Sequence, residues 1–157
     1  MRRGGVSGEG WGESVAIGVL ALARRVEGEL GEGLGELGLT VGRLGLLGHI
    51  GGGEGISFSE LARRSGVSVQ SAHAGVKGLV AAGLVRDRRG GGGAASAIEL
   101  TDKGIRLLGE AREVVAKVDR RLFGVEADPV MRRMGAALRA AYRVMCRGEG
   151  RHSLQRG

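Results

Sequence analysis

The chain has 157 residues, enough for one domain with a buried core, and only 3% of them are aromatic, so that core must be aliphatic. The formal charge is +7, and clustered positive charge favours a polyanionic partner. The single cysteine excludes an internal disulfide, and no apolar run approaches the ~20 residues that cross a bilayer. We therefore expect a cytoplasmic protein that has no contact with a membrane.

Two helices are predicted in the first third of the chain. Ser14 can cap a helix that continues to about Glu36, because apolar residues step along it by threes and fours. A second helix begins at Leu39 and Thr40 and ends at the glycines that start with Gly51. The chain contains 33 glycines, and each one inside a helix costs about 1 kcal/mol relative to alanine. Such helices need packing partners, which favours an oligomer.

The next segment has the pattern of a helix-turn-helix. Ser57 and Glu60 form an S-x-x-E capping box, and Gly66 supplies the backbone freedom that ends this helix. Ser68 caps the following helix, which Gly83 ends. The spacing is that of a second helix projected from a supporting one. Its apolar stripe is Ala72, Val76 and Leu79, while Gln70, Ser71, His73 and Lys77 fall away from it.

A strand-loop-strand follows the helix-turn-helix. Residues 84–87 and 97–100 are typical of short strands, and Arg88, Arg89 and the glycines 90–93 lie between them. A basic, glycine-rich tip can lie along phosphates, with its backbone approaching closely. The alternative is a hairpin loop whose arginines are only solvated. A helical hairpin that merely packs is also possible, but it gives no reason for two strands to follow.

Two long helices complete the predicted chain. Thr101 caps the first, which runs to about Leu122, and Asp128-Pro129 begins the second. In the first, a near-heptad stripe is formed by Ile105, Leu108, Val115, Val118 and Leu122. The second is expected to bury Val130, Met134, Leu138, Ala141 and Met145, and to expose Arg132, Arg133, Arg139 and Arg143. Residues 128–157 carry seven basic and two acidic side chains, so the positive charge peaks at this end.

Four segments resemble the MarR family of bacterial winged-helix regulators: LGELGLTVGRLGLLGHI, SFSELARRSGVS, GLVAAGLVRDRR and IELTDKGIRLL. The resemblance covers about residues 14–147. It implies a mainly α fold with a small β-wing, in which a winged helix-turn-helix lobe (39–101) is flanked by dimerisation helices (14–37 and 102–147). The chain is then one domain of 1–157, with flexible ends at 1–12 and 148–157. Partners are implied as well: double-stranded DNA and a second copy, whose two recognition helices enter successive major grooves of a pseudo-palindromic operator.

The resemblance also implies which residues contact DNA. In the recognition helix and the wing these are Ser68, Val69, Gln70, Ser71, His73, Ala74, Lys77, Arg86, Arg88 and Arg89. The chain departs from the family at Ala74, where a basic residue is usual, and at its uncharged wing tip. Base readout then falls on Gln70, Ser71 and His73, among which glutamine to adenine is the best-defined pairing.

The same resemblance implies a repressor that a small phenolic or lipophilic effector releases from DNA. The corresponding effector positions are Leu39, Arg43, Leu46 and His49. Family members that sense oxidants use a cysteine near the N-terminus, whereas Cys146 lies in the last helix and is expected to be a buried or interface thiol.

Two other functions compete with the regulator. An enzyme is not expected, because the chain has no Ser/His/Asp order, no metal-ligand cluster and no phosphate-binding loop; no cofactor or metal is expected either. A winged-helix protein-interaction module with weakened or lost DNA binding is an open alternative, favoured by Ala74 and the uncharged wing tip.

Overall fold

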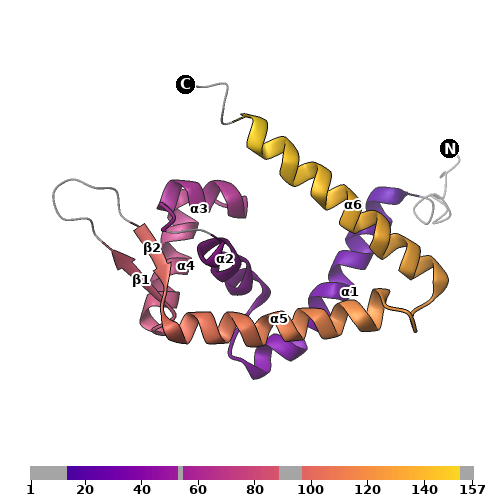
Figure 1. Ribbon diagram of the computed structural model, residues 1–157, viewed down its shortest axis with the longest axis horizontal. Helices are drawn as coiled ribbons and strands as arrows, with labels where there is room; N and C mark the ends of the chain where they lie inside the picture. Colours follow the sequence, from indigo (N-terminus) through magenta and orange to yellow (C-terminus); the bar gives the residue numbers. More distant parts are fainter. Residues whose placement is uncertain (1–13, 53–54, 89–96, 153–157) are drawn as a thin grey trace, which may run out of the picture. The chain divides into compact units, whose positions relative to one another are not determined.

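Six helices and one two-stranded sheet make up the described part of the computed structural model (Figure 1). That part comprises residues 14–52, 55–88 and 97–152, of which 145–152 are described as backbone only. The elements are α1 (Val15–Glu36), α2 (Val41–Gly51), α3 (Phe58–Ser65), α4 (Val69–Ala81), β1 (Val85–Arg88), β2 (Ala97–Leu100), α5 (Asp102–Phe123) and α6 (Pro129–His152). This architecture confirms the predicted mainly α fold with a small β-wing. Two compact units, Met1–Val114 and Val115–Gly157, divide the chain within α5.

The starts of five helices, α1 to α5, are set by hydroxyl side chains. The oxygens of Ser14, Thr40, Ser57 and Ser68 accept the backbone N–H of the residue three positions on, at 3.4, 3.2, 3.2 and 3.1 Å. Thr101 does the same for Gly104 at the start of α5, at 3.1 Å. Each bond satisfies an amide that the first turn of a helix leaves without a partner. The predicted starts of these five helices are therefore confirmed by the contacts that cause them.

Left-handed glycines end both helices of the helix-turn-helix. Gly66 has φ +65° after α3, and Gly83 has φ +71° after α4. In each case the next residue donates its N–H back across the last turn, Val67 to the Ala62 carbonyl at 3.1 Å and Leu84 to Leu79 at 2.9 Å. This is the Schellman motif, which favours glycine because a Cβ is strained at positive φ. The two glycines thus set where the chain leaves α3 and α4.

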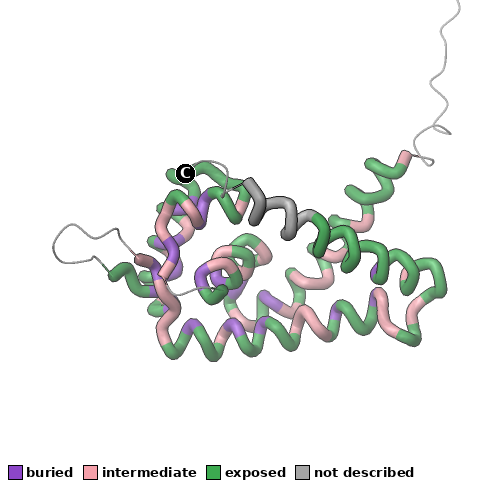
Figure 2. Tube along the Cα trace, turned by 45° about the horizontal axis from the view of Figure 1, so that its top comes forward, coloured by how far each residue is buried: buried purple, intermediate pink, exposed green. Residues whose placement is uncertain are grey.

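The first unit has one aliphatic core, as the composition predicts. The largest fully buried side chains are Leu34, Leu47, Ile50, Leu61, Leu79 and Ile98, so α1 to α4 and β2 all contribute (Figure 2). β1 and β2 pair antiparallel, with Val85 opposite Leu100 and Arg88 opposite Ala97. Ile56 extends the sheet by a bridge to Ile98. β1 begins one residue later than predicted, whereas β2 has the predicted bounds.

The predicted apolar stripe of α5 is wrong at one position. Ile105 is 57% exposed, while its neighbour Gly104 is buried. A Cβ at Gly104 would collide with the Leu84 carbonyl oxygen, so only glycine allows the backbone of α5 this close to the end of α4. The apolar periodicity of the sequence did not predict the burial of Gly104, because glycine has no side chain that counts as apolar.

The prediction that α6 buries an apolar stripe is also wrong for the single chain. Val130 is 55% exposed, Leu138 is 44% exposed, and Met134 and Ala141 are also exposed. The side chain of Met145 lies outside the described residues, as does that of Cys146. The four arginines expected outside, Arg132, Arg133, Arg139 and Arg143, are exposed. These residues do form an apolar face, but that face is exposed among the residues that the structure describes.

α1 shows the same behaviour in its first half. Val15 is 82% exposed, Val19 54% and Leu20 57%, whereas Leu34 near the end of the helix is fully buried. The apolar residues that step along α1 are thus covered only towards its C-terminus. No helix of the described part is long and apolar enough to span a membrane.

Candidate nucleic-acid interface

The exposed side of α4 carries the residues predicted to contact DNA. Ala72, Val76 and Leu79 are buried and hold the helix on the core. The opposite side exposes Val69, Gln70, Ser71, His73, Ala74 and Lys77. Ser68 is exposed too, but it is the capping residue immediately before α4 and not part of the helix. Six of the predicted contacts therefore share one accessible helix, and the seventh starts it.

The Ser68 hydroxyl is used within the protein. Its Oγ accepts the Ser71 backbone N–H at 3.1 Å and donates to the Ser71 Oγ at 2.9 Å. Both bonds stabilise the first turn of α4. The Ser71 hydroxyl hydrogen is not used by either bond, so Ser71 can still donate. Ser68 therefore positions the helix, and Ser71 is the serine suited to contact a base or phosphate.

His73 is held against α3 by an aromatic contact. Its ring stacks on Phe58, with ring centroids 3.7 Å apart and planes inclined by 18°. The contact fixes the imidazole on α4 relative to α3. Phe58 was not among the predicted site residues; its position in the first turn of the supporting helix is the only sequence signal for it. Both rings line a hollow of about 480 Å³ between α4 and β1, together with Ala74, Val76, Lys77, Val80 and Asp87.

The wing arginines share one carboxylate. Arg86 Nη2 lies 3.1 Å from Glu99 Oε2, and Arg88 Nη1 lies 3.2 Å from Glu99 Oε1. The strand register causes this, because Glu99 is directly opposite Arg86 and Arg88 is two residues along the same face. The hydrogen bond from Arg86, helped by the charge of Arg88, lowers the pKa of Glu99. Both arginine side chains remain mostly exposed, at 61% and 67%. Arg89 and the glycines 90–93 lie outside the described residues.

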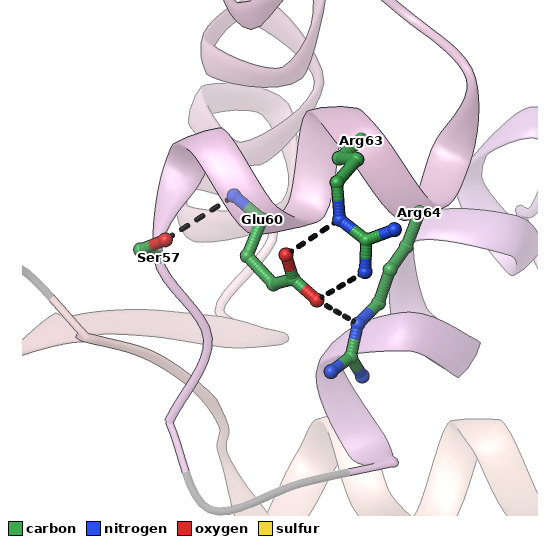
Figure 3. Close-up of polar contacts among 4 residues, drawn as sticks. All are labelled: Ser57, Glu60, Arg63 and Arg64. Atoms are coloured by element: carbon green, nitrogen blue, oxygen red, sulfur yellow. Dashed lines mark hydrogen bonds and ion pairs between the residues drawn. The ribbon is translucent and has the colours of Figure 1, made fainter. Parts of the chain in front are cut away.

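A second cluster of the same composition lies on α3 (Figure 3). The Glu60 carboxylate accepts hydrogen bonds from Arg63 at 2.8 Å through both oxygens and from Arg64 at 2.6 Å. These bonds, that of Arg63 first, lower the pKa of Glu60 from 4.5 to about 2. The capping box is therefore formed only in part: Ser57 Oγ accepts the Glu60 N–H, while the carboxylate binds arginines. Neither glutamate was predicted as a site residue, although Glu60 was predicted as a cap.

The end of α4 is fastened to the start of α5. Lys103 Nζ donates to the Ala82 carbonyl at 2.9 Å, and Thr101 Oγ1 donates to the Gly83 carbonyl at 2.6 Å. The Thr101 N–H donates to the Leu84 carbonyl at 3.0 Å. A lysine ammonium beside the last carbonyls of a helix also suits the helix dipole. The helix predicted to read DNA is thus fixed at its far end by the side chains of Thr101 and Lys103.

Three of the four predicted effector positions line one hollow between α2 and α4. Arg43, Leu46 and His49 contribute to a space of about 420 Å³, which Ser65 and Gly75 also line. Gly75 admits Leu46, since a Cβ there would overlap the leucine side chain. The Ser65 Oγ is buried, with no hydrogen-bond partner in the described part of the chain. Leu39 is 4% exposed, belongs to the core and lines no part of this space.

Arg43 also lines a second, smaller hollow of about 290 Å³, where Lys103, Arg106 and Glu110 of α5 meet the ends of α1 and α4. Among the described residues no group of three or more His, Cys, Asp or Glu could hold a metal ion.

Comparison with known proteins supports the family resemblance. The MarR family model matches residues 37–94, the segment from the end of α1 into the wing. Curated protein sequences give no match. A solved MarR family protein of Mycobacterium tuberculosis in complex with salicylic acid is 25% identical, with a TM-score of 0.66 over 82% of this chain and 96% of that one. The same protein in complex with DNA is 24% identical, with a TM-score of 0.69 over 82% and 97%. CouR from Rhodococcus jostii, bound to p-coumaroyl-CoA, is 22% identical, with a TM-score of 0.69 over 83% and 93%.

Proposed function

We propose that this chain, a divergent and glycine-rich member of the MarR family, is a sequence-specific DNA-binding transcriptional regulator that represses a pseudo-palindromic operator as a homodimer. The observation that carries the proposal is the exposed face of α4, with six of the predicted contacts on one helix beside a wing whose arginines are exposed. The solved neighbour in complex with DNA has the same fold.

Dimer formation is supported by large apolar side chains that are exposed in the part of the chain that the structure describes. On α1 these are Val15, Ile17, Val19 and Leu20, and on α6 Val130, Met134, Leu138, Tyr142 and Val144. Exposed apolar stripes of this length on helices mark interaction surfaces. The regulator needs two copies, because two recognition helices at a fixed spacing read a pseudo-palindrome.

A salt titration on random duplex tests DNA binding itself. We expect affinity to fall steeply as salt rises, because Lys77 and the wing arginines displace counterions from phosphates. The alternative function, a protein-interaction module, is supported by two observations. Val69 and Val80 on α4 are exposed, and four arginines are paired with glutamates. No measurable binding at low salt would exclude the regulator and favour that module.

Gln70 and Arg88 are assigned different roles. Gln70 is exposed near the start of α4 and is suited to a base edge, while Arg88 lies on the wing and is suited to phosphate. Gln70→Ala should therefore relax sequence choice, whereas Arg88→Ala should weaken all sequences alike. Equal, sequence-independent losses in both variants would refute this division.

We propose that an effector binds in the hollow between α2 and α4. Arg43 and His49 can interact with an acidic or phenolic group there, and Leu46 can contact an apolar ring. Salicylate is the first probe, since the solved neighbour binds salicylic acid. Gly45 lines the hollow and Gly48 does not, yet both have open space around them. Gly45→Phe should abolish release of DNA by salicylate, and Gly48→Phe should retain it. Release that survives in Gly45→Phe would place the effector elsewhere.

A further inference from the structure

We propose that the start of α4 reads adenine together with the methyl group of thymine, so that the centre of each operator half-site consists of A·T base pairs. The inference rests on the proposed DNA-binding function and names the bases that this function would select.

The first turn of α4 presents an apolar side chain where base edges are read. Val69 is the first residue of the helix and is 45% exposed, although its neighbours Ala72 and Val76 are buried. The N-terminal residues of a recognition helix are the ones that reach base edges in the major groove. In that groove the thymine C5-methyl is the only apolar group, and apolar side chains recognise it. Ala74 adds a second small apolar side chain to the exposed face.

Polar residues beside Val69 suit the partner base. Gln70 is exposed and can form two hydrogen bonds with the N6 and N7 atoms of adenine. Residues four apart lie on one line of a helix, so Gln70 is aligned with Ala74, and Val69 with His73. The two lines are adjacent, because their first members are consecutive in the sequence. The line of Gln70 and Ala74 therefore carries an amide and a methyl group. In the major groove an A·T pair presents the adenine N6 and N7 atoms to the amide and the thymine methyl group to the alanine.

Guanine has few partners on this helix. Arginine or lysine bound to O6 and N7 is the commonest guanine contact, and α4 contains no arginine and one lysine, Lys77, two turns from its start. The described arginines of α3 and β1 are ion-paired: Arg63 and Arg64 with Glu60, and Arg86 and Arg88 with Glu99. The start of α4 thus presents side chains suited to adenine and thymine and contains no arginine or lysine, the commonest partners of guanine.

The test uses the intact protein and synthetic duplexes. Half-sites are first selected from a random pool, and each thymine at their centre is then replaced by deoxyuridine, which removes only the methyl group. We expect A·T-rich half-sites and at least one thymine per half-site whose replacement weakens binding about fourfold, the equivalent of one buried methyl. Val69→Ala should lose that sensitivity, and Val80→Ala, with an equally exposed valine at the other end of α4, should keep it.

Three outcomes separate the ideas. Selection of G·C-rich centres, or equal affinity for thymine and deoxyuridine at every position in the unaltered protein, overturns the inference and leaves DNA binding intact. The deoxyuridine comparison needs no variant, so misfolding of Val69→Ala cannot hide the result. Absence of any duplex binding at low salt overturns the proposed function itself.

Discussion

Glu99→Gln tests whether the wing arginines are restrained from phosphate. Glu99 binds Arg86 through Nε and Nη2 at 3.2 and 3.1 Å and binds Arg88 through Nη1 at 3.2 Å. A DNA phosphate would have to share these two guanidinium groups with the carboxylate or replace it. Glutamine keeps the shape of the side chain and one hydrogen-bond acceptor but removes the negative charge, so the cluster changes from one net positive charge to two.

The magnitude follows from counterion release. The slope of log affinity against log salt is about −0.9 for each phosphate neutralised, so one additional free charge steepens it by about 0.9 per protomer. Between about 50 and 200 mM salt, the additional loss of affinity is then about 3.5-fold per protomer. At low salt the variant should bind all sequences more tightly than the unaltered protein. Its ratio of specific to non-specific affinity should fall, because the gain does not depend on sequence.

Fluorescence anisotropy on a random duplex and on the selected operator, over a series of salt concentrations, measures both quantities. Glu113→Gln is the matched control: it makes the same change in formal charge on an exposed residue of α5 and leaves the wing unchanged. Weaker binding by Glu99→Gln would refute the reasoning, since Glu99 would then align the arginines for phosphate. A slope equal to that of Glu113→Gln would show that Arg86 and Arg88 do not contact DNA.

Three further predictions concern stability and assembly. Gly104→Ala should lower the free energy of unfolding by about 2 kcal/mol or more, because the added Cβ meets the Leu84 carbonyl. Gly109→Ala, at a position with nothing within 4 Å, should raise the free energy of unfolding by about 0.5–1 kcal/mol. Urea denaturation at one protein concentration compares the two variants, and equal effects would contradict the close approach of α5 to Leu84. The pKa of Glu60 is lowered to about 2 in the folded state, so its ion pairs stabilise the protein above pH 4.5 and are lost as pH falls from 4.5 towards 2. Across that range the free energy of unfolding, measured by denaturation at each pH, should change less with pH in Glu60→Gln than in the unaltered protein. An unchanged pH dependence would show that the carboxylate is not paired in solution. Leu20→Glu should weaken the dimer without unfolding the chain, because Leu20 is 57% exposed in one chain; sedimentation equilibrium measures this, and an unchanged association constant would remove α1 from the interface.

The caps and the stripe of the recognition helix could be predicted because their causes are local. Ser14, Thr40, Ser57, Ser68 and Thr101 each bind an amide three residues away, so the sequence contains both partners of every contact. The stripe of α4 also depends only on helical spacing, and it lies where periodicity predicted. Gly66 and Gly83 belong to the same class, since a left-handed residue at a helix end favours glycine wherever it occurs.

The contacts that could not be predicted join distant parts of the chain. Glu99 pairs with Arg86 only because the strands are aligned in one particular register. The composition of residues 89–96, between the two strands, does not predict that register. The burial of Gly104 depends on the carbonyl of Leu84, twenty residues earlier. The stripes of α1 and α6 show a different limit. Their spacing identifies an apolar face correctly, but it does not say whether the same chain or a second copy covers that face.

The contacts around α4 indicate how an effector in the hollow between α2 and α4 would act. The start of α4 is fixed by the Ser68 cap and by the stack of His73 on Phe58, and its end by Gly83 and the bonds from Thr101 and Lys103. Bending the helix would break one of these sets of contacts. Along its length, however, the side that faces α2 carries Gly75, against which Leu46 lies closely.

A ligand that displaces Leu46 would therefore push on α4 at its middle, and the helix would move together with α3 and the start of α5. A ligand shifts the equilibrium between two positions of α4 only as far as its affinity differs between them. Leu46→Ala removes the side chain that transmits the push. In that variant salicylate should still bind, but it should release DNA less effectively. Loss of binding and of release in equal measure would show that Leu46 serves only as a contact for the ligand.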